Sequence, residues 1–410
     1  MKSKKWLALL LAGAMALSAG CAQTAATPSQ GTAGSAAPAA SAGTSNSSGE
    51  IVIGSLLDLS SNMASAGKAT QWGINYAIDE INNAGGINGK KLKVVHYDIK
   101  SDVNESITAY NRLVDQDKAV AVVGPGLSNI GIALAPISEN KKVPIVSQFM
   151  DERATTNEKA NKPWGYIYLA EPSCNQQAQA IAAYSIDKLK IKNVAILYDS
   201  SNAYSTTHAV PFQKYVESKG IKVVASESFT SDTKDYKAQL TKIISANPDA
   251  IFIPAYVQQN ALAYKQARQL GYTGMIIGNN TYTAPFNTLV AGTSMDKLYF
   301  IYNVDFQSDQ TKFLSDAYKK ANNNVDPLTN VAFGYDDVKI IANALKLAKN
   351  PQDSQEVNSL IESKTTDVKT ASGNITIDPK THRPVGMGVY IAQWDESGKK
   401  VKLLDYYKSN

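Results

Sequence analysis

The sequence is poor in the residues that most often carry catalytic or metal-binding chemistry. It contains two cysteines and three histidines in 410 residues. Cys21 and Cys174 stand far apart in the chain, so we expect no disulfide framework, and no spacing typical of a metal site occurs. None of His96, His208 and His382 falls in a motif that would make it a general base or a ligand. We therefore expect no metal, no cofactor and no enzyme activity.

Basic clusters and the common catalytic motifs are missing as well. The net charge of +5 falls to +2 when Lys2, Lys4 and Lys5 are left out, and no basic run remains that would indicate nucleic-acid binding. The sequence contains no G-x-S-x-G turn, no H-E-x-x-H pair and no phosphate-binding loop. These absences disfavour a nucleic-acid partner and the better-known enzyme classes.

Residues 1–20 have the pattern of a secretory signal peptide. Three lysines precede an apolar run at 6–17, which is too short to span a bilayer. The small residues at 18–20, followed by Cys21, resemble the processing box of a bacterial lipoprotein; the alternative is an ordinary signal peptide with an incidental cysteine. A lipid on Cys21 would hold the protein at the extracytoplasmic face of the cell membrane.

Residues 21–49 are expected to form a tether between this lipid and the folded part. The stretch 22–49 contains neither a charged residue nor a large apolar one. Such a composition cannot bury a core, so the tether should be disordered.

From residue 50 the chain alternates between apolar runs of strand length and segments with helical spacing. The expected strands lie at 51–57, 92–97, 119–123, 142–147, 194–198, 222–226, 250–254 and 275–278. Expected helices include 73–83, 175–188, 206–219, 235–246, 258–270 and 336–349, and strand-like pieces lie near 375–377 and 388–394. This alternation is typical of parallel sheets covered by helices on both faces. Because two such series follow one another, we predict two lobes of one α/β architecture.

One glycine-bearing turn points to a ligand site. Its sequence, AVAVVGPGLSN at 119–129, joins an expected strand to an expected helix. Such a turn leaves backbone N–H groups at the positive end of a helix dipole, where a carboxylate binds well. Ser128 adds a hydroxyl that serves either as the helix N-cap or as a ligand donor. A capped helix without any ligand explains the same residues.

Several segments together resemble the amino-acid-type periplasmic binding proteins of ABC importers, of which the branched-chain amino-acid receptors are the best-known group. They are IVIGSLLDLSSNMASAG, AIDEINNAGGINGKKLKVVHYD, VAVVGPGLSN, VAILYDSSNAYS and FGYDDVKIIANAL, in this order along residues 50–410. The resemblance implies two doubly wound parallel-sheet lobes joined by a three-crossover hinge. Lobe one would comprise 50–170 plus 303–385, and lobe two 171–301 plus 387–410. The ligand would lie in the cleft beyond the carboxyl ends of the strands.

The resemblance also implies the ligand-binding residues. In these receptors the turn of the VVGP type meets the ligand carboxylate, which places Ser128 at the site. The loop after the next strand contributes Met150 and Asp151 at positions that contact the carboxylate and ammonium groups. In lobe two, Tyr204 matches the tyrosine that closes over the ligand, and Tyr256 matches a second pocket aromatic.

Asn280 is a further site position, and it departs from the branched-chain pattern. These receptors place a carboxylate near this point to pair with the ligand ammonium, whereas this chain reads GNN at 278–280. An amide supplies hydrogen bonds but no counter-charge. Either Asp151 pairs with the ammonium instead, or the ligand is not a simple α-amino acid. Ala66 stands where an aromatic residue is common, which leaves room for a bulkier ligand.

The resemblance implies an extracytoplasmic solute-binding receptor of an ABC importer. It would capture a branched-chain or related amino acid by hinge closure, and its partners would be a permease, an ATPase and the membrane. We expect a monomer. One alternative is a ligand-sensing module for another small carboxylate or amide, although no second apolar segment of about 20 residues follows the fold. Another is a secreted α/β hydrolase with Ser128 as its nucleophile.

Overall fold

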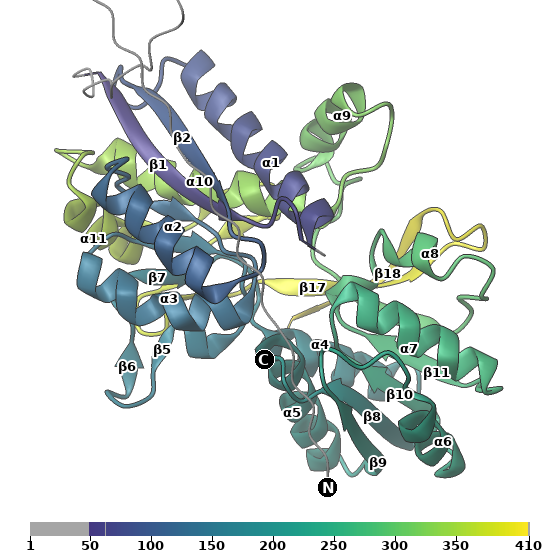
Figure 1. The fold of residues 1–410 in the computed structure, drawn as a ribbon. Coiled ribbons are helices and arrows are strands. Elements are labelled where there is room, and N and C mark those ends of the chain that lie inside the picture. Colours follow the sequence, from purple (N-terminus) through teal and green to yellow (C-terminus); the bar gives the residue numbers. More distant parts are fainter. Residues whose placement is uncertain (1–48, 62, 409–410) are drawn as a thin grey trace, which may run out of the picture. The chain divides into compact units, whose positions relative to one another are not determined.

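The computed structural model describes residues 49–61 and 63–408, which lie within one compact unit. Two main sheets, each covered by helices, organise these residues (Figure 1). None of the described helices combines the length and the hydropathy that a bilayer crossing requires. The expected signal peptide, Cys21 and the tether up to residue 48 lie outside the described residues.

The first sheet has five parallel strands in the order β2-β1-β3-β4-β7. Its strands are β1 (Glu50–Leu57), β2 (Lys91–Asp98), β3 (Val122–Val123), β4 (Ile145–Ser147) and β7 (Ile167–Leu169). The helices of this lobe are α1 (Ala64–Asn83), α2 (Val103–Asp115), α3 (Ser128–Lys141), α10 (Thr329–Leu347) and α11 (Ser354–Lys364). Seven of the eight residues of β1 are buried, as expected for a strand covered on both faces.

Helices α1 and α10 come from distant parts of the sequence and pack closely together. A glycine of each helix faces the backbone of the other. A Cβ atom on Gly73 would lie 2.0 Å from the Val331 carbonyl oxygen, and one on Gly334 would lie 2.2 Å from the Thr70 carbonyl oxygen. Any larger residue would therefore force the helices apart. This contact fixes the C-terminal helix α10 to the N-terminal part of the first lobe.

The second sheet has seven strands in the order β18-β17-β12-β11-β10-β8-β9. The parallel part consists of β8 (Asn193–Asp199), β9 (Lys222–Phe229), β10 (Ala250–Ile253), β11 (Met275–Gly278) and β12 (Leu298–Tyr302). At one edge, β17 (Gly388–Trp394) and β18 (Val401–Lys408) add antiparallel strands. The main helices here are α4 (Cys174–Asp187), α5 (Ala203–Ser218), α6 (Lys237–Ser245), α7 (Val257–Gln269) and the short α8 (Phe286–Leu289).

The chain passes between the two sheets three times: after β7, after β12 and before β17 (Figure 1). Between the second and third crossings it forms α9 (Lys312–Ala321), α10 and α11. Short paired strands complete the described elements: β5 (Thr156–Asn157), β6 (Lys162–Pro163), β13 (Val368–Lys369), β14 (Asn374–Ile375), β15 (Ile377–Asp378) and β16 (Arg383–Pro384). The predicted architecture, with two α/β lobes and three crossovers, is confirmed.

Several elements differ from those expected from the sequence. The helices α1 and α10 begin at Ala64 and Thr329 rather than at residues 73 and 336, and neither has a side-chain cap that would mark its start. The strand expected at 119–123 is confined to Val122–Val123. The edge strand β18 was not expected, because its sequence is too polar to stand out as a strand.

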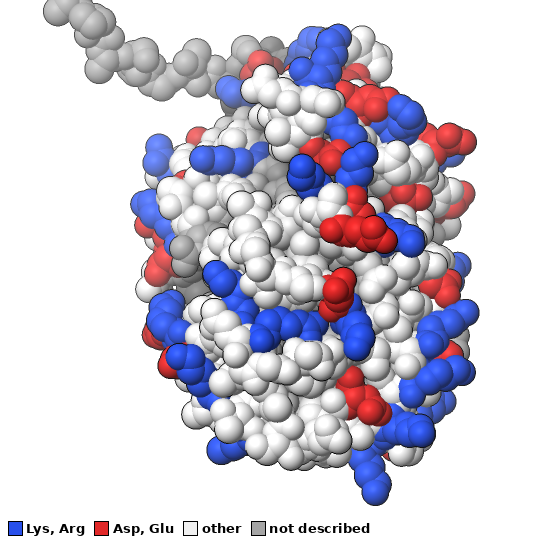
Figure 2. All heavy atoms as spheres, turned by 90° about the vertical axis from the view of Figure 1, so that its right-hand side faces the viewer, with Lys and Arg blue, Asp and Glu red and all other residues white. Residues whose placement is uncertain are grey.

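Charged side chains of both signs are interspersed over the face of the molecule shown in Figure 2. No broad area of one sign gathers on this face.

Candidate functional site

A cavity of about 120 Å³ lies between the two lobes, beyond the carboxyl ends of β4, β10 and β11. This is where open α/β sheets bind their ligands. Among the described residues that line it, none carries a charged or imidazole side chain. The first lobe contributes mainly Met63, Ala66, Gln148, Met150, Thr329 and Phe333, and the second mainly Tyr204, Tyr256, Gln258, Asn280, Thr281 and Thr283.

Four of the residues predicted from the sequence come together in this cavity. The rings of Tyr204 and Tyr256 stack with their centroids 4.9 Å apart and their planes 5° from parallel. The Tyr204 hydroxyl donates a hydrogen bond to Asn280 Oδ1, and Asn280 Nδ2 lies 3.5 Å from Met150 Sδ. Burial raises the pKa of Tyr204 well above its usual value, so its hydroxyl remains a proton donor. These side chains build a neutral, largely aromatic surface.

The backbone of Met150 has an unusual conformation. Its φ of 60° is in the left-handed region that residues other than glycine seldom adopt. The surrounding contacts hold it there: the Met150 carbonyl accepts a hydrogen bond from the Cys174 backbone N–H at 2.7 Å, and the side chain is buried. The loop after β4 therefore turns sharply where it meets the cavity.

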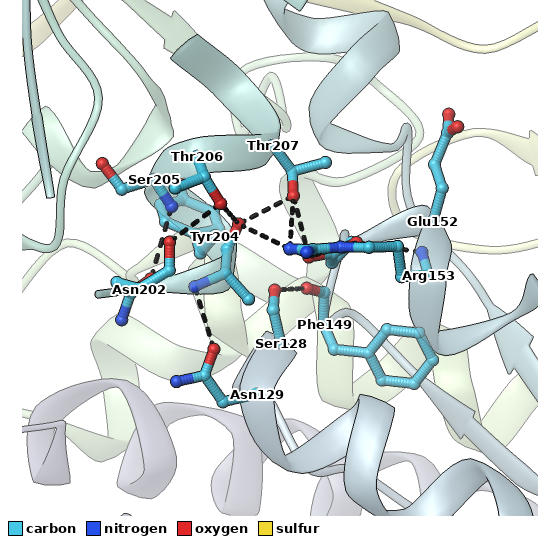
Figure 3. Close-up of polar contacts among 12 residues, drawn as sticks. Ser128, Asn129, Phe149, Glu152, Arg153, Asn202, Tyr204, Ser205, Thr206 and Thr207 are labelled. Atoms are coloured by element: carbon cyan, nitrogen blue, oxygen red, sulfur yellow. Dashed lines mark hydrogen bonds and ion pairs between the residues drawn. The ribbon is translucent and has the colours of Figure 1, made fainter. Parts of the chain in front are cut away.

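Ser128 lies beside the cavity and does not line it. Its hydroxyl donates a hydrogen bond to the Phe149 carbonyl, and the residue is 1% exposed (Figure 3). The N-cap interpretation is wrong, because Leu127 occupies the N-cap position and α3 has no side-chain cap. Burial raises the pKa of the Tyr256 hydroxyl, and the Ser128 backbone partly opposes the increase.

Asp151 also does not line the cavity, because its carboxylate forms part of a contact between the lobes. It is fully buried and lies 2.7 Å from Arg153 Nη2, and its Oδ2 accepts a hydrogen bond from Thr207 Oγ1 at 2.8 Å. The Arg153 Nη2 also donates to Thr207 Oγ1 at 3.1 Å (Figure 3). We call Asp151, Arg153 and Thr207 the interlobe latch. The hydrogen bond with Asp151 raises the pKa of Arg153 and keeps its guanidinium charged.

A second polar contact crosses between the lobes close to the latch. The Ala203 backbone N–H, in the first turn of α5, donates to Asn129 Oδ1 at 2.9 Å (Figure 3). Asn129 stands in the first turn of α3, so the starts of two helices from different lobes are joined directly. The lobes thus meet through hydrogen bonds on one side of the cavity.

Three further buried carboxyl groups lie away from the cavity lining. Glu171, Asp336 and Asp337 are at most 1% exposed. Asp336 accepts hydrogen bonds from the backbone N–H groups of Ala371 and Ser372, and burial raises its pKa to about 7. Within the described part of the chain, the carboxyl oxygens of Glu171 and Asp337 have no hydrogen-bond partner. Burial, and then the neighbouring carboxyl groups, raise the pKa of both.

Gln148 was not predicted from the sequence as a site residue. Its side chain lines the cavity and is 5% exposed, and its Oε1 has no partner among the described residues. The signal for it was an amide at the end of the apolar strand VPIVSQ. Thr281, Thr329 and Phe333 also line the cavity without having been predicted. Ala66 lines it too, so the small residue noted at this position does leave space there.

Comparison with known proteins identifies the family. A family model described as periplasmic binding protein matches residues 50–399. A leucine-, isoleucine-, valine-, threonine- and alanine-binding protein of Pseudomonas aeruginosa is 27% identical over 78% of this chain and 83% of its own length. A second relative, the Leu/Ile/Val-binding protein homolog 3 of Brucella melitensis, is 25% identical over 86% of this chain and 94% of its own.

Solved structures lead to the same family. The branched-chain amino acid transporter substrate-binding protein LivJ of Streptococcus pneumoniae, in complex with isoleucine, superposes with a TM-score of 0.78. It is 30% identical, and the match covers 88% of this chain and 99% of that one. The leucine-binding protein LivK of Thermotoga maritima has a TM-score of 0.79 at 26% identity, with 87% and 99% covered.

The family and the relatives named above are binding proteins rather than enzymes, and the family implies a location outside the cytoplasm. The fold, the cavity between the lobes and the match over most of the described residues agree with one another. This chain therefore belongs to the periplasmic binding protein family.

Proposed function

We propose that this protein is the extracytoplasmic solute receptor of an ABC importer. It captures a branched-chain amino acid or a related small solute in the cavity between its lobes. The observation that carries the proposal is this cavity, which strand ends of both lobes line. The names of the similar proteins, which bind leucine, isoleucine or valine, support the same class of ligand.

Met150, Tyr204, Tyr256 and Asn280 are the proposed ligand contacts, since all four line the cavity. Asp151 acts instead by closing the lobes through the latch. Ser128 acts through its backbone at the start of α3 and through its bond to Phe149. We retain the predicted lobes, 50–170 plus 303–385 and 171–301 plus 387–410, which are supported by the three crossings between the sheets.

Transport proceeds by hinge closure in this proposal. The solute binds more tightly to the closed arrangement and shifts the lobes toward it, and the permease recognises the closed surface. The latch and the Asn129–Ala203 hydrogen bond are the kind of contacts that form only on closure. The protein works as a monomer, with a permease and its ATPase as partners.

The hydrolase alternative is not favoured by the surroundings of Ser128. Its hydroxyl is bonded to a backbone carbonyl rather than to a histidine, and it is nearly inaccessible. A nucleophile needs an adjacent base and an open approach for the substrate. We therefore do not propose catalysis.

A thermal-shift screen of the full chain, purified in detergent and freed of bound solute, tests the proposed function. The screen covers the twenty amino acids, small amides, and aliphatic and aromatic carboxylates. A tight ligand raises the unfolding temperature by mass action. We expect a dose-dependent increase with at least one of these compounds; no response from any of them would contradict the proposed function.

We also propose that a lipid on Cys21 holds the receptor to the membrane. Cys21→Ser would remove the attachment point for the acyl chains, whose burial in the bilayer provides the anchoring free energy. We expect this variant in the soluble fraction after cell fractionation, with the unsubstituted protein in the membrane fraction. Retention of the variant in the membrane would show that another segment anchors the protein.

A further inference from the structure

The cavity offers no side-chain counter-charge to the ammonium group of an amino acid. Burial of an ammonium without a carboxylate partner is costly, even when it keeps some hydrogen bonds. Asn280 supplies only an amide, and its oxygen already accepts from the Tyr204 hydroxyl. The nearest carboxylate that the sequence suggested, Asp151, is neutralised by Arg153 and lies outside the lining.

The hydroxyl at the N-terminus of α3 is also unavailable to a ligand carboxylate. The N-terminus of α3 would attract an anion through its free N–H groups. The Ser128 hydroxyl is used in the bond to the Phe149 carbonyl. The cavity therefore offers a zwitterion neither a charged side chain nor the Ser128 hydroxyl.

What the cavity does offer is an unused neutral acceptor. Gln148 lines it, and its Oε1 has no partner among the described residues although the residue is more than nine-tenths buried. An unmet buried acceptor is unfavourable and would be satisfied by an N–H or O–H of the ligand. The nearest acceptor for Asn280 Nδ2 is the Met150 thioether at 3.5 Å, and a thioether is a weak acceptor. The Asn280 Nδ2–H group can therefore donate a hydrogen bond to a ligand carbonyl.

Resting on the proposed function, we propose that the site selects an uncharged solute: an apolar body that carries a neutral amide. The amide N–H would bind Gln148 Oε1, and the amide carbonyl would accept from Asn280 Nδ2. The apolar body would lie against the stacked tyrosines and Phe333. Such a ligand satisfies the exposed polar groups of the cavity and buries no charge.

Four compounds with one carbon skeleton test this selection. They are 4-methylpentanamide (neutral), leucine (zwitterion), 4-methylpentanoate (anion) and 4-methylpentan-1-amine (cation), each titrated calorimetrically into the full chain. We expect the amide to bind at least about tenfold more tightly than leucine, a difference of about 1.4 kcal/mol. Equal or tighter binding of leucine would overturn the inference and leave the proposed function intact. No binding in this series or in the screen would overturn both.

Asn280→Asp introduces a negative charge into the cavity and keeps an oxygen that can accept from Tyr204. We expect it to strengthen binding of the two ammonium-bearing compounds relative to the amide by about tenfold or more. Asn202→Asp is the matched control: Asn202 caps α5 outside the cavity, and aspartate caps equally well. The Asn202→Asp variant should bind the four compounds in the same order of affinity as the unsubstituted protein. If the Asn280→Asp variant keeps the same order of affinities, the proposed contact between Asn280 and the ligand is contradicted.

Discussion

Two regions of the molecule bury carboxyl groups completely, and they treat them in opposite ways. In the interlobe latch, Asp151 lies against a guanidinium and a hydroxyl. In the cluster of Glu171, Asp336 and Asp337, no cation is among the causes of the raised pKa values, and two of the three groups have no hydrogen-bond partner in the described part. The first region holds a charge pair, and the second favours neutral acids.

The difference shows that burial alone does not decide whether a carboxyl group stabilises or destabilises the fold. Burial disfavours the ionised form of each group, and only the partners decide whether the charge is retained. Asp151 retains partners from both lobes, so its charge can hold the lobes together. Asp337 has only another carboxyl group as an electrostatic neighbour, so its ionisation can only weaken the fold.

Arg153→Met should leave the interlobe latch with a buried carboxyl group and no cation, as in the cluster of Glu171, Asp336 and Asp337. We expect this substitution to have the largest effect on the free energy of unfolding. The substitution leaves the Asp151 carboxylate buried without its cation, which should lower the free energy of unfolding by about 3 kcal/mol at pH 7. Arg153 is 46% exposed on its side chain, so the loss should lie at the low end of the range for buried pairs. Urea denaturation followed by circular dichroism measures it.

Thr207→Val is the matched control, because it removes a neutral hydrogen bond to Asp151 and leaves the ion pair. We expect a loss of only about 1 kcal/mol. The Arg153→Met variant should also lose stability as the pH rises, since its unpaired buried carboxyl must then ionise. Equal losses in the two variants would show that the charge of Arg153 adds nothing to the latch.

Asp337→Asn should have a smaller effect and the opposite sign. The pKa of Asp337 is raised in the folded state, so its neutral form stabilises the fold below the unfolded pKa of about 4. This contribution is lost as the pH rises through the folded value. The amide cannot ionise, so we expect the stability of the variant relative to the unsubstituted protein to increase from pH 5 to pH 8, by about 1 kcal/mol or more.

Thermal unfolding of both proteins between pH 5 and pH 8 measures this difference. Asp336 ionises near pH 7 in the same cluster, so the unsubstituted protein should lose stability over this interval. Asp309→Asn, at an exposed turn position, controls for removal of one negative charge. A destabilised Asp337→Asn variant at pH 8 would mean that the ionised carboxylate has a stabilising partner.

Much of the fold could be predicted because its signals are local. The run AIFIP predicted a strand at 250–254 and the structure has β10 at Ala250–Ile253, and α7 lies within one residue of its prediction. The edge strand β18 could not be predicted in this way. Its exposed positions carry Lys402, Tyr406 and Lys408, and its strand conformation comes from pairing with β17 rather than from its own composition.

The residues of the candidate site also fall into those that could be predicted from the sequence and those that could not. Residues at strand ends, such as Tyr256 and Asn280, could be placed near a cleft because parallel strands end at one edge. The role of Asp151 could not, because one of its partners, Thr207, comes from the other lobe, 56 residues further along the chain. The missing partner of Gln148 is equally invisible in a sequence, since it depends on everything that surrounds the side chain.

The hydrogen bond between Asn129 and Ala203 has a consequence for the populations of open and closed receptor. This contact and the latch join the lobes through groups of the chain itself, so part of the free energy of closure does not come from the solute. The apparent dissociation constant equals the intrinsic one divided by the fraction of molecules competent to bind. When that fraction is already high, every solute gains equally from closure. Discrimination between solutes must then come from the hydrogen bonds inside the cavity and not from the movement of the hinge.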